Sequence, residues 1–96
     1  MKLLDIAAEL SRETGVPVSS ITGRGGGASQ PRRAAIWAAR ELLGYSFNRI
    51  GMLFDGRDHT TIICAYRCAL NLRKTDAEFY ELTEYVRGLM LLGKAA

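Results

Sequence analysis

A short run of hydrogen-bonding side chains, Arg57-Asp58-His59-Thr60-Thr61, stands between a glycine turn and a long segment of helical periodicity. Asp58 could accept a hydrogen bond from cytosine N4 or could cap a helix. His59 could donate or accept near neutral pH, or be an ordinary surface residue. Thr61 carries a hydroxyl and a methyl group, and the methyl suits contact with the thymine C5-methyl. The chemistry of this run is recognition by hydrogen bonding, with base edges among the candidate ligands.

Arginine is concentrated in the middle of the chain. Residues 24–57 hold six basic residues, all of them arginine, against two acidic ones, while residues 1–23 have a net charge of −1 and residues 58–96 of zero. A guanidinium group presents a planar fork of donors suited to phosphate and to guanine edges. A total charge of +3 also fits a solvated surface, but the clustering favours a polyanion, most simply nucleic acid.

Other chemistries have less support. Cys64, Cys68 and His59 make a weak zinc pattern, and reduced thiols without a role are the better interpretation, in a reducing compartment. His59 and Asp58 lack a matched nucleophile, so we expect no enzyme. The sequence contains no G-x-x-x-x-G-K-[ST] loop, and we expect no nucleotide cofactor and no metal.

The periodicity of apolar residues predicts an all-α fold, a small helical bundle forming a single domain over residues 1–96. Ser46 and Asp58 are expected to cap helices, and Thr75 and Glu78 to form a capping box. No apolar run approaches the ~18 residues that span a bilayer, and the N-terminus does not resemble a signal peptide, so we expect a cytoplasmic protein with no membrane contact. The expected helices cover residues 2–14, 18–21, 31–43, 47–53, 58–73 and 75–92, with a flexible glycine-rich loop at 23–29.

The spacing also predicts which side chains are buried. Trp37 shares a helix face with apolar neighbours and is expected in the core. Leu4 and Leu53 are expected on the inward faces of their helices. On the helix that follows Asp58, Cys64 is expected to be partly exposed, whereas Cys68, at the edge of the apolar stripe, is expected to be mostly buried.

Residues 46–73 have the outline of a helix-turn-helix, with a short helix, a tight glycine turn and a longer helix. In this motif the second helix enters the major groove of DNA by its N-terminal end. The polar run at positions 57–61 stands at that end.

The run Gly56-Arg57-Asp58-His59-Thr60-Thr61-Ile62 resembles the signature of the C-terminal DNA-binding domain of the bacterial replication initiator DnaA. Flanking matches at fixed spacing include Pro31-Arg32-Arg33, Ala39-Arg40-Glu41-Leu42, and Ser46 with Ile50-Gly51. The resemblance covers roughly residues 18–73. It implies a helical domain that binds a nine-base-pair box in double-stranded DNA, on the bacterial nucleoid.

The resemblance also implies roles for individual residues. Arg24, in the loop, would reach into the minor groove. The helix that begins at the signature would read the major groove, with Asp58, His59, Thr60 and Thr61 at base-contacting positions. The positions expected to grip the DNA backbone, or to help hold the site, are Arg32, Arg33, Arg40 and Arg57.

Two departures from the family pattern qualify these expectations. Gly25-Gly26-Gly27 leaves Arg24 nearly alone in a loop that is usually basic, so we expect weaker phosphate contact. The chain has no ATP-binding domain, which supports box binding without ATP-driven opening of an origin. Met1 followed by a well-patterned helix favours a complete small protein, acting as a competitor of the full initiator or as a transcription regulator.

The alternative is a protein-interaction module on the same scaffold that has lost specific DNA binding. The depleted loop and the modest net charge motivate this interpretation. The apolar tail Leu89-Met90-Leu91-Leu92 would then be a partner surface.

Overall fold

The computed structural model describes residues 2–23 and 29–92, which form helices and contain no strand. This confirms the all-α prediction. None of the described helices is both long and apolar enough to pass through a bilayer. The helices are α1 (Leu3–Thr14), α2 (Val18–Thr22), α3 (Ser29–Glu41), α4 (Phe47–Leu53), α5 (His59–Thr75) and α6 (Ala77–Leu91).

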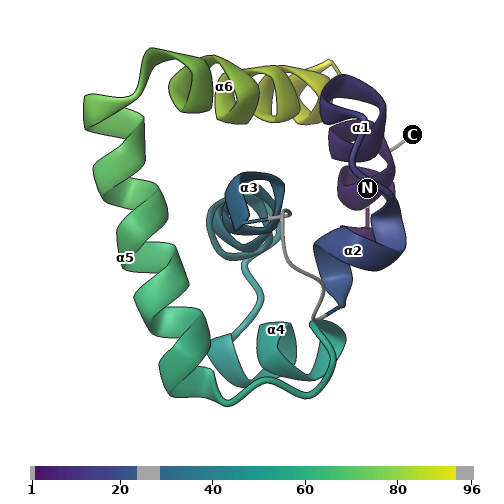
Figure 1. The fold of residues 1–96 in the computed structure, drawn as a ribbon, viewed down its shortest axis with the longest axis vertical. Helices are drawn as coiled ribbons and strands as arrows, with labels where there is room; N and C mark the ends of the chain where they lie inside the picture. The colour runs from purple at the N-terminus through teal and green to yellow at the C-terminus, as the bar shows by residue number, and fades with distance from the viewer. Residues whose placement is uncertain (1, 24–28, 93–96) are drawn as a thin grey trace.

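Helix α3 is the centre of the domain. Figure 1 shows it end-on, with the other helices arranged around it as a ring, and it packs against each of them. A helix enclosed in this way must be apolar on nearly every side, and Ile36 and Trp37 are buried together with alanines 34, 35, 38 and 39. The prediction that Trp37 belongs to the core is confirmed. The alanines allow the surrounding helices to approach α3 closely.

Local signals explain most of the helix ends. Gly15 ends α1 at a φ of 77°, a left-handed conformation that favours glycine. The Ser46 side chain accepts a hydrogen bond from the Arg49 backbone nitrogen at 3.2 Å and caps α4. The predicted capping box at Thr75 is wrong, because Thr75 is the last residue of α5 and the cap of α6 is Asp76. The Asp76 carboxylate accepts from the Phe79 backbone nitrogen at 3.1 Å.

Two predicted core residues are exposed. Leu4 is 67% exposed, because the inward face of α1 runs through Leu3, Ile6 and Leu10. Leu53 is 45% exposed, and the fully buried Phe54 occupies the core at the end of α4 instead. In each helix the exposed leucine stands at the edge of the predicted apolar stripe, and the periodicity of the sequence does not decide whether such an edge position is covered.

Arg73 fixes the C-terminal half of α5. Its guanidinium carbon lies 4.4 Å from the centre of the Trp37 ring and 4.8 Å from that of Tyr80. One nitrogen donates to the Glu84 carboxylate at 2.6 Å, and this hydrogen bond lowers the pKa of Glu84. Another donates to the Thr83 hydroxyl. These contacts join α5 to α3 and α6 and set the direction in which α5 projects.

Tyr66 joins the middle of α5 to the end of α3. Its hydroxyl donates to the Glu41 carboxylate, and its ring meets Phe47 edge-on at 5.5 Å. Burial, reinforced by the Glu41 carboxylate, raises the pKa of Tyr66 from 10.0 to about 12. The neutral hydroxyl is therefore favoured in the folded state.

Tyr66 should make the domain sensitive to alkali. Because its folded-state pKa lies above the unfolded value, its contribution to stability is complete below pH 10.0 and is lost as the pH rises towards about 12. The difference between the 295 nm absorbance titrations of wild type and Tyr66→Phe should show the ionisation of one tyrosine with a pKa of about 12. A difference curve centred near 10.0 would contradict the assignment.

Candidate nucleic-acid interface

The N-terminal tip of α5 is polar and open to solvent. Asp58, His59, Thr60 and Thr61 are all exposed. One Asp58 carboxylate oxygen accepts from the Thr60 backbone nitrogen at 3.0 Å, so Asp58 caps the helix as expected. That hydrogen bond lowers the pKa of Asp58 and so favours its ionised form. Capping does not withdraw the side chain from the surface, since it remains 66% exposed.

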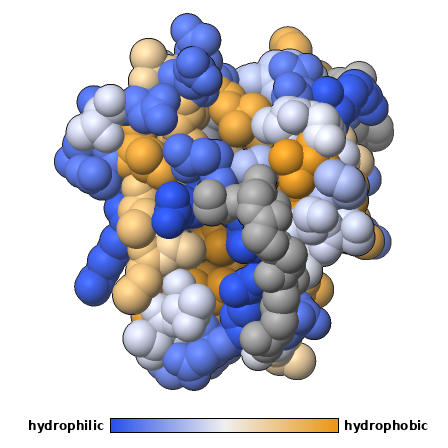
Figure 2. All heavy atoms as spheres, viewed as in Figure 1, coloured by the Kyte–Doolittle hydropathy of each residue, from blue (hydrophilic) through white to orange (hydrophobic). Residues whose placement is uncertain are grey.

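The tip lies at the lower edge of the molecule in Figure 1, where α4 ends and α5 begins. Hydrophilic side chains gather along this edge in the space-filling view of Figure 2. His59 is 54% exposed, and its Nδ1 lies 3.7 Å from Asp58 Oδ1. The opposite side of the helix is anchored by the buried Ile62 and Ala69. The core therefore holds α5 with its polar tip outward.

A close backbone contact forms the turn between α4 and α5. The Arg57 backbone nitrogen donates to the Gly51 carbonyl at 2.8 Å. A Cβ atom on Gly51 would lie 2.2 Å from the Arg57 carbonyl oxygen, so only glycine fits here. Asp55 and Gly56 complete the turn in left-handed conformations, with φ of 63° and 65°.

Arg57 and Arg32 point to the end of α2 and not to open solvent. Arg57 Nη2 donates to the Gly23 carbonyl at 2.6 Å. Arg32 donates from Nε to the Ile21 carbonyl at 3.0 Å and from Nη2 to the Ser20 carbonyl at 2.6 Å. The sequence predicted that these two arginines grip the DNA backbone or help hold the site, and these contacts favour the second role.

Arg40 lies on the surface. Its guanidinium carbon is 4.4 Å from the centre of the Phe47 ring, and Nη1 donates to the Tyr45 carbonyl at 3.2 Å. Arg33, on α3, is partly buried. Arg24, the predicted minor-groove residue, lies outside the described residues. Phosphate contact by Arg33 and Arg40, and base contact by Arg24, stay predictions.

The predicted site omitted Arg49, an exposed residue of α4. Its guanidinium carbon lies 3.8 Å from the centre of the Tyr45 ring. In a helix-turn-helix the first helix crosses the phosphate backbone, so a cation on α4 is well placed for contact. The signal was available in the sequence, because Arg49 stands in the first helix of the predicted motif.

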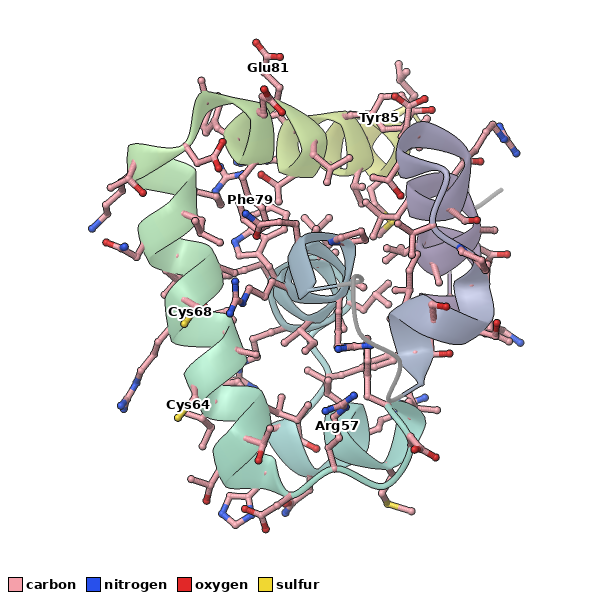
Figure 3. All side chains as sticks on the ribbon, viewed as in Figure 1. Arg57, Cys64, Cys68, Phe79, Glu81 and Tyr85 are labelled. Atoms are coloured by element: carbon pink, nitrogen blue, oxygen red, sulfur yellow. The ribbon has the colours of Figure 1, made fainter. Side chains whose placement is uncertain are left out.

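Both thiols are exposed on α5. This confirms the prediction for Cys64, which points outward in Figure 3. The prediction for Cys68 is wrong, because the inward face of α5 passes through Ala69, and the residue before it is turned about 100° away. Within residues 2–23 and 29–92, no three histidine, cysteine or acidic side chains lie close enough to hold a metal ion.

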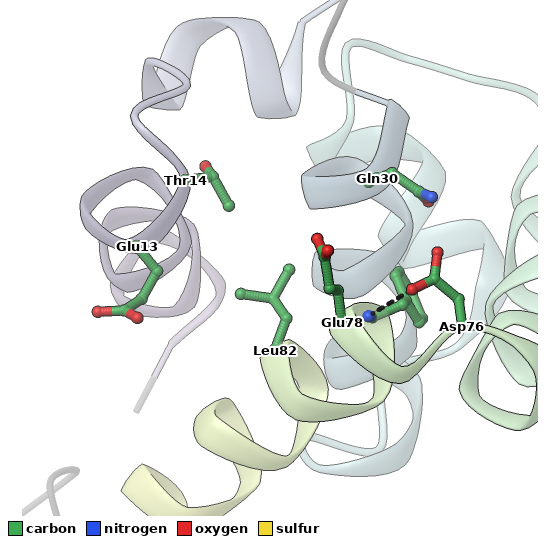
Figure 4. Close-up of a pocket in the computed structure, with 7 residues that line it drawn as sticks. Glu13, Thr14, Gln30, Asp76, Glu78 and Leu82 are labelled. Atoms are coloured by element: carbon green, nitrogen blue, oxygen red, sulfur yellow. Dashed lines mark hydrogen bonds between the residues drawn. The ribbon is translucent and has the colours of Figure 1, made fainter.

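A hollow of about 340 Å³ lies between the end of α1 and the starts of α3 and α6 (Figure 4). Glu13, Asp76 and Glu78 line it, together with Thr14, Gln30, Phe79 and Leu82. Three acidic side chains make this face unsuitable for a polyanion. None of the predicted site residues lines the hollow, so the acidic face and the α5 tip are separate regions.

A family model described as the bacterial DnaA protein helix-turn-helix matches residues 4–68, about two thirds of the chain. The chain belongs to this family. The match runs from α1 well into α5 and includes the α4–turn–α5 motif and its exposed tip. Membership of the DnaA helix-turn-helix family supports DNA binding as the activity of the domain.

Curated relatives agree with this assignment. The chromosomal replication initiator protein DnaA of Acinetobacter baumannii (strain AYE) is 45% identical over 64 residues, which are 67% of this chain and 13% of the relative. The protein of the same name from Azoarcus sp. (strain BH72) is 41% identical over 64 residues, 62% of this chain and 13% of the relative. The chain thus spans about an eighth of the length of the DnaA proteins it matches.

Proposed function

We propose that this chain is a sequence-specific double-stranded DNA-binding domain that recognises DnaA-box-like sites. The observation that carries the proposal is the exposed tip of α5, where the family signature presents Asp58, His59, Thr60 and Thr61 outward from a helix anchored in the core. In the proposed complex this tip enters the major groove and reads base edges.

Arginines outside the tip would supply the remaining contacts. Arg40 and Arg49 are exposed near the start of α4 and would bind phosphates. Arg33, which the sequence also predicted at a backbone-contacting position, would add a third phosphate contact. Such contacts fix the register of a protein on the duplex without reading its sequence. Arg24 would enter the adjacent minor groove, where readout is largely of A·T against G·C pairs.

The proposal is tested by fluorescence anisotropy with two duplexes of equal length and composition, one carrying a DnaA box and one scrambled, at matched salt. We expect the box duplex to bind at least about tenfold more tightly, a modest ratio for a specific site. Affinity should fall as salt rises, because bound arginines release counterions. Equal affinities for the two duplexes would overturn the proposal.

Arg24→Ala should weaken binding to the box and reduce the dependence on A·T pairs beside it. If the guanidinium replaces a counterion, the slope of log affinity against log salt should become shallower by about 0.9. Arg12→Ala is the matched control, since Arg12 has a 70% exposed side chain on α1 paired with Glu9. Equal losses in the two variants would contradict a specific role for Arg24.

Bound to such sites, the domain would compete with the full initiator for boxes or would regulate transcription. A second candidate function is a protein-interaction module. Leu91 and Leu92 favour it, because they are 79% and 80% exposed at the end of α6. Failure of both duplexes to bind at low salt would support this second candidate.

A further inference from the structure

We propose that Arg57 is a positioning residue, whose hydrogen bond to the Gly23 carbonyl sets the backbone that leads to Arg24 in a fixed relation to the α5 tip. This inference rests on the proposed DNA-binding function. It assigns Arg57 a task different from phosphate contact and makes the signature arginine a link between the two DNA-reading elements.

The backbone of Arg57 is held in place by the turn. Its nitrogen donates to the Gly51 carbonyl at 2.8 Å, and its carbonyl oxygen lies where a Gly51 side chain would otherwise be. Asp58, the cap of α5, follows directly in the chain. A side chain that starts from Arg57 is therefore rigidly connected to the recognition tip.

The side chain of Arg57 extends into the molecule. Figure 3 shows it pointing from the turn towards the interior of the ring of helices. Nη2 donates to the Gly23 carbonyl at 2.6 Å, and Nε is buried without a hydrogen-bond partner among the described residues. Bidentate phosphate contact uses two donors of the guanidinium fork, and on the Nε–Nη2 edge of Arg57 one donor is engaged and the other is enclosed by protein.

Arg32 acts on the same helix end. It donates to the Ser20 and Ile21 carbonyls, and its pKa is lowered by burial and by the nearby charge of Arg57. Two like charges are held together here because the last carbonyls of a helix lack partners within the helix and carry partial negative charge. Together the two arginines form a clamp on the end of α2.

The clamp acts on a defined peptide unit. Arg57 holds the carbonyl group of Gly23, and Arg24 is the next residue in the chain. Gly23 itself has no room for a side chain, because a Cβ atom would lie 2.4 Å from the Ser19 carbonyl oxygen. One hydrogen bond thus connects the residue before Asp58 to the residue before Arg24.

A double-mutant cycle with the whole 96-residue chain tests the proposal. Binding to the box duplex is measured over a range of salt for wild type, Arg57→Met, Arg24→Ala and the double variant. We expect Arg57→Met to weaken binding about tenfold in the wild-type background and less than about twofold in the Arg24→Ala background, because its effect passes through Arg24. In the Arg24→Ala background the salt slope should not change.

A phosphate contact would behave differently. The losses from the two substitutions would add, and Arg57→Met would make the salt slope shallower by about 0.9 in both backgrounds. Arg57→Lys separates the roles further, since lysine keeps the charge but lacks the reach and planar fork of the guanidinium. We expect Arg57→Lys to bind as weakly as Arg57→Met, whereas rescue by lysine would overturn the proposal. If Arg57→Met does not fold, Arg57→Lys replaces it in the cycle.

Equal wild-type affinity for box and scrambled duplexes would refute the proposed function. The clamp on the end of α2 could then still be tested without DNA. Amide hydrogen exchange at the end of α2 should then be faster in Arg57→Lys than in wild type, and unchanged in the control Arg49→Lys. Unchanged exchange in Arg57→Lys would refute the clamp.

Discussion

Gly51→Ala should destabilise the domain by about 2 kcal/mol or more, although alanine is the better helix former. Gly51 lies within α4, where replacing glycine would ordinarily gain up to about 1 kcal/mol. The new Cβ atom, however, would lie 2.2 Å from the Arg57 carbonyl oxygen. That oxygen is part of the backbone and cannot rotate away as the end of a side chain would. The steric conflict therefore outweighs the gain in helix propensity.

Gly88→Ala is the matched control for this prediction. Gly88 lies inside α6, and a Cβ atom there would meet nothing within 4 Å. The same substitution should stabilise the domain by about 0.5–1 kcal/mol at this position. Urea denaturation followed by circular dichroism gives both free energies of unfolding. A Gly51→Ala protein as stable as wild type would show that the turn can adopt another geometry.

Local signals in the sequence were sufficient to predict the helices. The bounds of α4 agree with the predicted segment 47–53, because Ser46 gives a clear cap and a glycine turn follows. The start of α6 was misassigned by one or two residues, since Thr75 and Asp76 are both good caps and only the length of α5 decides between them. Burial at the edge of an apolar stripe, as for Leu4 and Cys68, depends on which neighbours cover the helix, and a single sequence does not contain that information.

The sequence predicted the exposure of the tip residues better than it predicted which arginines lie on the surface. The tip residues could be placed from sequence, because a helix N-terminus after a capped turn presents its first residues to solvent. The arginines could not be separated by charge alone. Arg40 and Arg49 are on the surface, while Arg32 donates to carbonyls of α2 and Arg57 donates to the carbonyl of that helix's cap, Gly23, across 34 positions of sequence. Partners so distant in the chain are set by tertiary packing.

His59→Ala and Thr61→Ala should each reduce binding to the box duplex by about 1–3 kcal/mol while leaving binding to the scrambled duplex unchanged. Both side chains are exposed at the tip, and neither accepts the capping hydrogen bond, which Asp58 provides. Their removal should therefore affect contacts to bases without destabilising α5. The measurement is anisotropy with the two duplexes at matched salt, for each variant and for wild type.

Two other variants distinguish base reading from general loss of affinity. Arg49→Ala should weaken binding to both duplexes alike and make the salt slope shallower, as expected for a phosphate contact. Asn71→Ala should change neither affinity, because Asn71 is exposed on α5 about 18 Å further along the helix axis than His59. If Thr61→Ala and His59→Ala instead resemble Arg49→Ala, the tip binds the backbone and specificity must come from other residues. If they resemble Asn71→Ala, the tip lies outside the DNA contact, and α5 does not enter the groove by its N-terminal end.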